Sequence, residues 1–253
     1  MKYKKSLLAL SIACTLAACG GGSDSSETPA EQNDDNGNGG GGGSTTTVTL
    51  VGKTTKGTLA NAIITAYKYV NGLPVKLEAS DFSSDSELVT DEDGNYTLTV
   101  LNYDGPVKVE VSPSADASSP TTMLCDAPNG CGATPYGAKL NLTSVDPSFS
   151  LSAITTVEQN EEVTVNLSAL THMVAALIED QASIDETVVA QQSSIVANAF
   201  DIAGDITTLE PTAVESAEKT SQEDNDAELR YGLINAGIAS AIFAEEGDAT
   251  NVL

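Results

Sequence analysis

The residues of this 253-residue chain best suited to covalent chemistry are its four cysteines. Cys14 and Cys19 belong to an N-terminal segment in which lysines precede an apolar run, residues 7–16, and small residues follow it. This order is typical of an export signal. The run is shorter than the roughly 20 apolar residues that span a bilayer, so we expect it to be removed. Cys125 and Cys131 stay in the exported part, where an oxidising compartment favours one disulfide between them.

The order Leu16-Ala17-Ala18-Cys19 resembles the lipobox of bacterial lipoproteins. The resemblance implies that a signal peptide, residues 1–18, is removed and that Cys19 becomes the acylated first residue. Because Gly20 rather than aspartate follows Cys19, it also implies sorting to the outer membrane of a Gram-negative cell, with the periplasmic or outward face left open. The alternative is an ordinary secretory signal with a coincidental cysteine.

The segment between Cys125 and Cys131 contains Pro128-Asn129-Gly130, a turn sequence that can bring the two side chains together. A disulfide across so short a loop constrains the unfolded chain by only about 2 kcal/mol, so its effect is mainly on local shape. A metal site is the alternative use of these thiols. It is less favoured, because there is no second cysteine pair and the one histidine, His172, lies in a segment with helical periodicity.

A second candidate for metal chemistry is the loop that contains Asp91, Asp93 and Asn95. Oxygen ligands at alternate positions suit a calcium ion, but the loop lacks the spacing and the final glutamate of an EF-hand. A hairpin turn in which Gly94 or Asn95 adopts a positive φ accounts for the same residues. We therefore favour the turn, with weakly bound Ca²⁺ as the alternative, and expect no cofactor besides the lipid on Cys19.

Catalytic motifs are absent from the sequence: it has no G-x-S-x-G, H-E-x-x-H, P-loop or Rossmann pattern, and a single histidine. Neighbouring carboxylates are expected by composition alone in a chain with 36 acidic residues. The lack of tryptophan disfavours a groove that cleaves sugars. We therefore expect that the protein is not an enzyme.

Tyrosines are the residues most able to stack on a ligand such as a sugar ring. The candidates are Tyr67, Tyr69, Tyr96, Tyr103 and Tyr136. The alternative is ordinary packing, since tyrosine is common in strands.

The net charge limits the partners of the chain. It is −25, and it becomes −28 when the three lysines of residues 1–18 are removed. So acidic a surface repels the phosphate backbone, which excludes nucleic acid as a partner.

Alternation of apolar and polar residues predicts short strands after a Gly-rich polar linker, residues 19–46. The predicted strands are residues 47–51, 62–67, 96–100 and 106–112, with weaker signals at 140–142, 149–151 and 163–165. Turn sequences at Asn71-Gly72, Asp93-Gly94-Asn95 and Asp104-Gly105-Pro106 separate them. This pattern indicates a small antiparallel β-sandwich.

The segments Gly57, 60–67, 90–98 and 105–111 together resemble the carboxypeptidase regulatory-like domain, a transthyretin-like (prealbumin-like) sandwich. The resemblance covers about a quarter of the chain and implies a non-catalytic module that sometimes accompanies carbohydrate-binding or surface proteins. More loosely, the rest resembles bacterial lipoproteins that place such a domain before a helical region.

The apolar period changes to 3.6 at Ser168, the predicted cap of a helix. A second helix is predicted from a capping box at Ser183 to a stop at Gly204, and a third from about Asp226. If the chain is a shortened member of its group, we expect the third helix to expose part of its apolar face.

The predicted organisation has five parts: signal peptide 1–18, linker 19–46, β-sandwich 47–115, a mixed β and loop region with the disulfide at 116–167, and a helical region 168–253. The function expected from it is that of a non-catalytic, lipid-anchored outer-membrane protein that presents the sandwich for interaction or adhesion. The alternatives are a carbohydrate-binding module and an accessory or remnant subunit of a larger surface enzyme. The expected partners are the membrane, through the lipid, and a surface protein or glycan.

Overall fold

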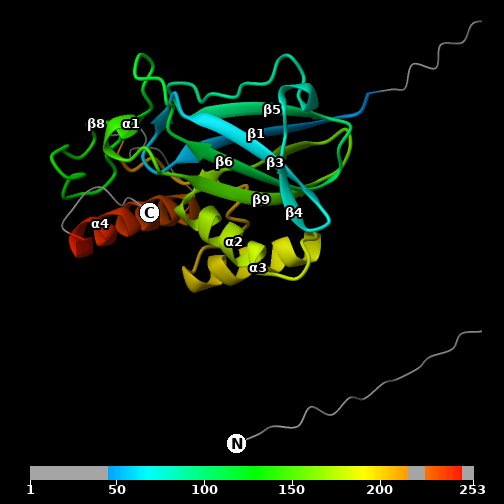
Figure 1. Ribbon diagram of the computed structural model, residues 1–253. Helices are drawn as coiled ribbons and strands as arrows, with labels where there is room; N and C mark the ends of the chain where they lie inside the picture. The colour runs from blue at the N-terminus through cyan, green and yellow to red at the C-terminus, as the bar shows by residue number, and fades with distance from the viewer. Residues whose placement is uncertain (1–44, 216–225, 247–253) are drawn as a thin grey trace, which may run out of the picture. The chain divides into compact units, whose positions relative to one another are not determined.

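The computed structural model describes residues 45–215 and 226–246, and all of them belong to one compact unit (Figure 1). The predicted signal peptide, Cys19 and nearly all of the predicted linker lie outside the described residues.

One of the two facing four-stranded sheets is antiparallel throughout and has the order β4-β3-β6-β9. Its strands are β3 (Ile63–Val70), β4 (Leu73–Lys76), β6 (Gly105–Ser112) and β9 (Leu151–Val157). Asn71 and Gly72 join β3 to β4 with φ values of 53° and 77°, which confirms the predicted hairpin turn.

The second sheet is built around β1. Its strands are β1 (Thr47–Thr55), β5 (Asn95–Leu101), β10 (Glu162–Thr164) and β11 (Leu167–Ser168). β5 is antiparallel to β1, whereas β10 and β11 run parallel to it, a pairing that the sequence did not predict. Gly52 lies beside the break between β10 and β11, where an added Cβ would come within 1.9 Å of the Val165 carbonyl oxygen. Only glycine permits this approach of the two backbones.

A small third sheet and two short helical turns complete the β region. The sheet contains β2 (Leu59–Ala60), β7 (Thr122–Leu124) and β8 (Lys139–Asn141), in the order β2-β7-β8. The turns are the 3₁₀ helix η1 (Ala79–Asp81) and α1 (Leu142–Val145).

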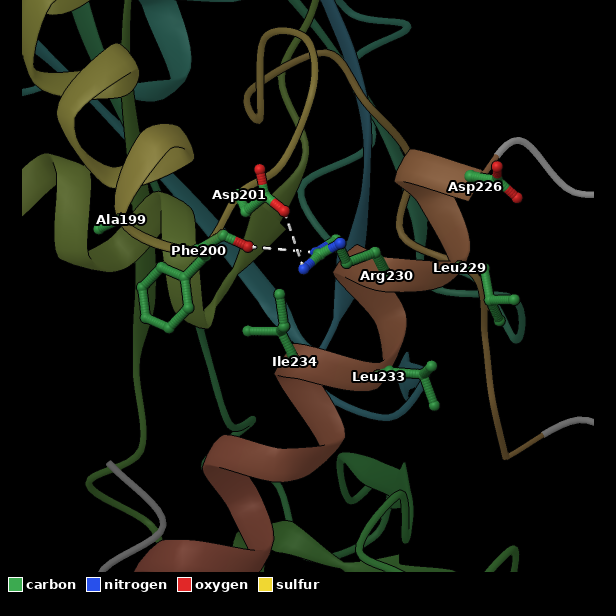
Figure 2. Close-up of a pocket in the computed structure, with 8 residues that line it drawn as sticks. All are labelled: Ala199, Phe200, Asp201, Asp226, Leu229, Arg230, Leu233 and Ile234. Carbon is green, nitrogen blue, oxygen red and sulfur yellow. Dashed lines mark hydrogen bonds and ion pairs between the residues drawn. The ribbon is translucent and has the colours of Figure 1, made fainter.

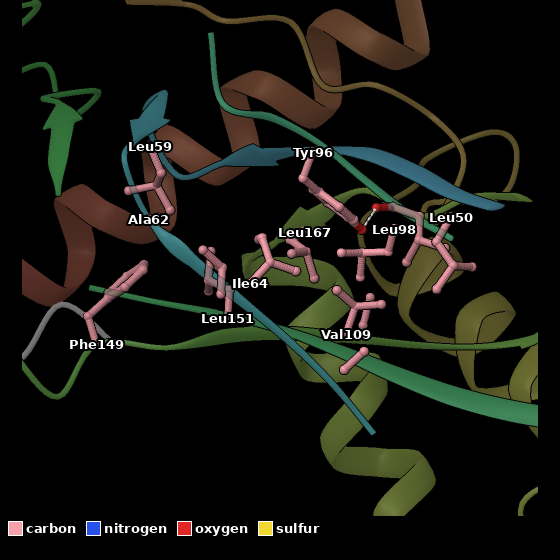
Figure 3. Close-up of a cluster of buried hydrophobic side chains, with 14 of the residues drawn as sticks. Leu50, Leu59, Ala62, Ile64, Tyr96, Leu98, Val109, Phe149, Leu151 and Leu167 are labelled. Atoms are coloured by element: carbon pink, nitrogen blue, oxygen red, sulfur yellow. Dashed lines mark hydrogen bonds between the residues drawn. The ribbon is translucent and has the colours of Figure 1, made fainter. Parts of the chain in front are cut away.

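The two larger sheets enclose the main apolar core, drawn in Figure 3. Val107, Val109 and Val111 of β6 are buried in it, whereas Lys108 and Glu110 face the other side of the sheet, as the alternation predicted. Each fully buried aliphatic side chain contributes roughly 1.5–3 kcal/mol. The β-sandwich fold class is therefore confirmed.

The predicted strand at 149–151 shares only its last residue with β9, which is buried on both faces for four residues in succession. Leu151 and Ala153 belong to the sandwich core, while Ile154 belongs to a second cluster formed with the helices. Because helices cover its outer face, β9 is apolar on both faces and lacks the alternation of apolar and polar residues that predicts a strand. The sheets thus continue past residue 115.

Three helices follow the strands, and α2 and α3 lie beside β9 (Figure 1). They are α2 (Ala169–Glu179), α3 (Glu186–Ala199) and α4 (Asp226–Glu246). Ser168 caps α2, as predicted, because its Oγ accepts a hydrogen bond from the Thr171 N–H at 3.2 Å. Within the described residues, none of the helices combines the length and the apolarity needed to cross a membrane.

The predicted ends of the second helix were wrong. Asp185, not Ser183, is the N-cap of α3: its Oδ1 accepts the Val188 N–H at 3.0 Å. A carboxylate also interacts favourably with the positive end of the helix, which favours Asp185 over the serine. The helix ends at Ala199, before Asp201 turns the backbone to a φ of 53°, and so it does not continue to Gly204.

Candidate functional site

The predicted tyrosines come together only in part. Tyr67 and Tyr69 point to the outward face of the β4-β3-β6-β9 sheet, where the Lys108 Nζ lies 5.8 Å from the centre of the Tyr67 ring. The same nitrogen is 2.9 Å from Oε1 of Glu179 on α2 and 3.6 Å from Oε2 of Glu110. We call these five residues the tyrosine–lysine patch; it offers one aromatic ring bordered by charged groups.

Two of the other predicted tyrosines, Tyr96 and Tyr103, have structural roles within the sandwich. Tyr96 is buried, and its hydroxyl donates a hydrogen bond to the Val165 carbonyl at 2.5 Å, so its prediction as a stacking residue was wrong. Tyr96 alternates with Leu98 and Val100, and all three face the core. Tyr103 donates to the Pro106 carbonyl at 2.7 Å and thereby fixes the connection between β5 and β6.

Tyr69 is also occupied. Its hydroxyl donates to Oε1 of Glu179 at 3.3 Å, and its ring packs against the helical cluster. Burial and the nearby Glu179 carboxylate raise the pKa of the Tyr69 hydroxyl well above its usual value. Tyr136 lies elsewhere, with its hydroxyl bonded to the Val214 carbonyl. Tyr67 is therefore the tyrosine of the patch best placed to meet a ligand.

His172 stands on α2 beside the patch. Its Nδ1 accepts a hydrogen bond from the Ser152 N–H at 3.2 Å, which requires this nitrogen to carry no proton. Burial, and then the positive charge of Lys108, lower the pKa of His172 below 6.5. The histidine thus serves as a neutral acceptor between α2 and β9.

The loop of the calcium prediction is a turn whose carboxylate is already used. Asp91 Oδ1 accepts the backbone N–H groups of Asp93 and Asn95 at 2.9 and 2.8 Å, and its Oδ2 accepts the Asn95 side-chain amide at 2.9 Å. These hydrogen bonds lower the pKa of Asp91 and outweigh the opposing effect of its burial. Gly94 has a φ of 80°, as the turn predicts. Nowhere in the described ranges do three or more His, Cys, Asp or Glu side chains form a group that could hold a metal ion.

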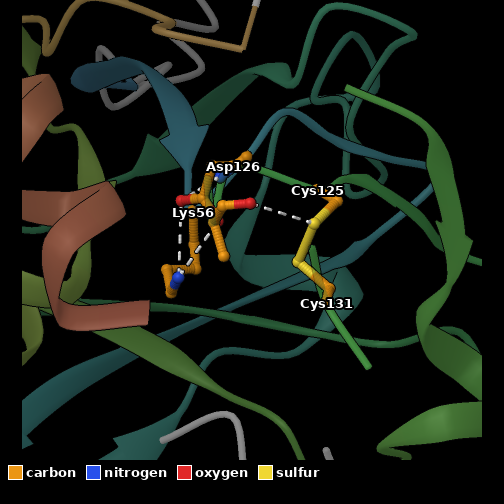
Figure 4. The surroundings of a disulfide bond; sticks show 6 residues. Lys56, Cys125, Asp126 and Cys131 are labelled. Atoms are coloured by element: carbon orange, nitrogen blue, oxygen red, sulfur yellow. Dashed lines mark hydrogen bonds and ion pairs between the residues drawn. A yellow bond between two sulfur atoms is a disulfide. The ribbon is translucent and has the colours of Figure 1, made fainter. Parts of the chain in front are cut away.

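Cys125 and Cys131 form the predicted disulfide, with their Cα atoms 5.7 Å apart (Figure 4). Both residues are buried. The backbone on either side is fixed by hydrogen bonds of the Cys125 N–H to the Ala138 carbonyl and of the Gly137 N–H to the Cys125 carbonyl. The next residue, Asp126, is consequently held in one place.

Asp126 faces Lys56 in the interior, as Figure 4 shows. The Lys56 Nζ lies 3.3 Å from Oδ1 and 3.4 Å from Oδ2 of Asp126, and the side chains of the two residues are 0% and 3% exposed. Asp126 Oδ2 also accepts the Gly57 N–H at 3.1 Å. Burial lowers the pKa of Lys56, although Asp126 acts in the opposite direction.

A third ionisable group, the half-buried Glu215, lies close enough for electrostatic interaction with both residues of this pair. Its Oε1 accepts the Thr58 N–H at 3.1 Å and the Thr58 hydroxyl at 3.3 Å. Burial raises the pKa of Glu215, and the negative charge of Asp126 adds to the shift. We call Lys56, Asp126 and Glu215 the buried charge cluster.

Sequence reasoning missed the buried charge cluster, although two of its neighbours gave a signal. Gly57 has a φ of 60°, and an added Cβ there would lie 1.8 Å from the Leu124 carbonyl oxygen. The backbone after β1 can therefore approach β7 only at a glycine, and this approach carries Lys56 to Asp126. The available signal was therefore positional: Lys56 directly precedes this glycine, and Asp126 directly follows Cys125.

Two of the hollows on the surface of the described part have contrasting linings. The one in Figure 2, of about 710 Å³, lies between the end of α3 and the start of α4; an ion pair of 3.0 Å joins Arg230 to Asp201 there. Leu229 and Leu233 of α4 border it and are 37% and 57% exposed. A second, of about 920 Å³, has five acidic residues among its lining residues. The first hollow thus has a lining of mixed polarity, whereas the lining of the second is strongly acidic.

No family model matches the chain, and no curated protein matches it. Among solved structures the chain is similar to a DUF3823 family protein from Parabacteroides merdae, with 15% sequence identity and a TM-score of 0.21. The match covers 48% of this chain and 45% of that protein, so the chain spans less than half of its length. The lipobox and the carboxypeptidase regulatory-like domain stay predictions.

Proposed function

We propose that the protein is a non-catalytic module of the bacterial cell envelope, anchored to the outer membrane by a lipid on Cys19, whose β-sandwich serves interaction or adhesion. The observation that carries this proposal is the buried disulfide between Cys125 and Cys131. Disulfides persist in oxidising compartments and are rare in the cytosol, so the disulfide supports export. The lipobox-like order that ends at Cys19 and the acidic composition agree with it.

The experiment compares wild type with Cys19→Ala in fractionated membranes of a Gram-negative host, with intact-mass measurement of the extracted protein. We expect the wild-type chain to start at Cys19 with added acyl mass. The variant should lose both the acyl mass and the membrane association. Cys14→Ala is the matched control and should behave like wild type. An unacylated, soluble wild-type protein would contradict the anchor and favour a freely diffusing binding protein.

Carbohydrate binding is the second candidate, and the tyrosine–lysine patch favours it. Tyr67 is partly exposed on a sheet face, next to the amine of Lys108 and the carboxylates of Glu110 and Glu179. Sugars are commonly bound by one aromatic face together with polar groups that accept and donate hydrogen bonds. A glycan array tests the candidate: binding should be lost in Tyr67→Ala and kept in Tyr136→Ala. Arrays without any binding by wild type would rule the candidate out.

A further inference from the structure

Exposed aliphatic side chains at one corner of the sandwich lie on the sheet face that elsewhere forms the core. Val70 of β3 pairs with Leu73 of β4, and both share the face of the buried Ala66. Val75 of β4 lies on this face too, because it pairs with Lys68. Val70, Leu73 and Val75 are nevertheless 45%, 69% and 42% exposed, and we call these three residues the hairpin patch. Clustered exposed apolar side chains mark surfaces that bind a partner or a membrane.

The edge of β4 disfavours an added strand as the occupant of this corner. The Leu77 N–H donates to the Ala66 carbonyl of β3 at 2.9 Å. Because the N–H groups of an antiparallel strand point alternately to its two sides, position 74 points away from β3. Pro74 has no N–H to offer there, so the outer edge lacks a donor in its middle. The hairpin patch therefore offers side-chain contacts rather than a backbone ladder.

The hairpin itself carries no negative charge. Residues 63–76 contain Lys68 and Lys76 but no aspartate or glutamate, although the chain has 36 acidic residues. The carboxylate of Asp81, on η1, approaches the hairpin and is paired with Lys68 at 3.3 Å. Carboxylates are costly to bring into a bilayer, whereas lysine side chains can extend back to its surface. The hairpin can thus enter a lipid surface without burying a carboxylate of its own.

The hairpin lies at the end of the sandwich where the chain arrives from Cys19. The Asn102 N–H donates to the Thr46 carbonyl at 2.9 Å, and the Thr46 N–H donates to Asn102 Oδ1 at 3.1 Å. The next residue, Tyr103, accepts the N–H of Tyr69 on β3 at 3.3 Å. The start of β1 and the β3–β4 turn consequently lie at the same end, toward the right of Figure 1. At most about 90 Å of chain separates Thr46 from Cys19.

We propose that the β3–β4 hairpin inserts the hairpin patch into the surface of a zwitterionic phospholipid bilayer and so holds the sandwich against the membrane. This inference rests on the proposed lipid anchor, because attachment through Cys19 raises the effective concentration of the hairpin at the membrane. The acidic hollow at the same end selects the lipid, since its carboxylates repel anionic headgroups. These carboxylates belong to Asp104, Glu158, Glu161, Asp185 and Glu186.

A single tryptophan tests the proposal, because the chain has none of its own. The protein is made from Cys19 onward, which keeps the whole compact unit, and Cys19, its one cysteine outside the disulfide, is coupled to a maleimide lipid in phosphatidylcholine vesicles. Leu73→Trp should then show a blue-shifted emission maximum and quenching by brominated lipid chains. Leu233→Trp replaces an exposed leucine of α4; it is the matched control and should show neither.

An unshifted emission at position 73, or equal shifts at positions 73 and 233, would overturn the proposal. Chemical coupling holds the protein on the vesicle whether or not cells acylate Cys19. Failure of the insertion is therefore distinct from failure of the anchor, which the fractionation of Cys19→Ala reports.

Two further changes assign the contact. In the Leu73→Trp protein, Val75→Glu should abolish the blue shift, because it places a carboxylate on the hairpin patch. Ile195→Glu adds the same charge at a 49% exposed position of α3 and should leave the shift intact. Partial replacement of phosphatidylcholine by phosphatidylglycerol should reduce the shift. A shift that survives Val75→Glu contradicts the role of the patch, and one that grows with phosphatidylglycerol contradicts the choice of a zwitterionic surface.

Discussion

Two lysines of this protein contact carboxylates in opposite surroundings. The Lys108 Nζ lies 2.9 Å from Glu179 at the surface, whereas the Lys56 Nζ lies 3.3 Å from Asp126 in the interior. The side chains of the surface pair are 15% and 38% exposed, against 0% and 3% for the buried pair. The shorter contact is the less consequential one, because water screens it and both partners can return to solvent. Burial, rather than distance, decides how much the fold depends on each pair.

The largest effect is expected from Asp126→Ala, which leaves the Lys56 amine buried without the carboxylate that faces it. Removal of one partner of a buried ion pair costs about 3–5 kcal/mol. Urea denaturation of wild type and variant measures the difference in the free energy of unfolding. Adding Lys56→Met to the variant removes the buried amine, so we expect the double variant to be more stable than Asp126→Ala alone. Equal stability of the two variants would show that the buried charge is not the cause.

A smaller effect is expected from the double substitution Cys125→Ala and Cys131→Ala. The short loop that the disulfide closes limits its stabilisation to about 2 kcal/mol. Thermal unfolding in oxidising buffer checks this prediction. The same unfolding in the presence of a reductant is the control, since the reductant should lower the melting temperature of wild type and leave the variant unchanged. A loss as large as that of Asp126→Ala would mean that the disulfide is what holds the buried charge cluster together.

For the surface pair, Glu179→Ala should cost less than about 1 kcal/mol, because exposed ion pairs contribute little. The substitution also removes the acceptor of the Tyr69 hydroxyl. Tyr69→Phe therefore serves as its matched control in the same urea experiment. A cost of several kcal/mol for Glu179→Ala would erase the contrast between the two lysines.

The smallest effect concerns pH and His172, next to the surface pair. The folded-state pKa of His172 lies below 6.5, so at pH values just below 6.5 the unfolded chain takes up a proton that the folded chain does not. Stability should therefore fall as the pH falls through this range. Glu215, whose pKa is raised, acts with the opposite sign, so the effect is read as the difference between wild type and His172→Gln. Equal slopes for the two proteins between pH 5 and 7 would contradict the prediction.

Much of the fold follows from local periodicity. β1, β3, β5 and β6 were predicted because each buries one face, and α2 because it buries one stripe. β9 was largely missed because helices cover its outer face, and β4 because all four of its residues are exposed. A strand that is buried on both faces or exposed on both faces has no alternation of apolar and polar residues from which it could be predicted.

The site was less predictable than the fold. Tyr96 shares its face with Leu98 and Val100, so its burial could have been foreseen from the pattern that predicted the strand. The Lys56–Asp126 contact could not, because it joins positions 70 residues apart. The contact depends on the backbone conformation at Gly57 and on the disulfide-bonded loop at Cys125. Local propensity and periodicity carry no information about contacts between such distant positions.

The parallel pairing of β1 with β10 and β11 has a consequence for the order in which the chain folds. β1 begins at Thr47, but its parallel partners lie at Glu162–Thr164 and Leu167–Ser168. Contacts between distant segments form slowly, because a long loop must close before they can be made. Of the strands in the described residues, β1 leaves the ribosome first but is completed last, and we expect the sandwich to stay open until residue 168 is available.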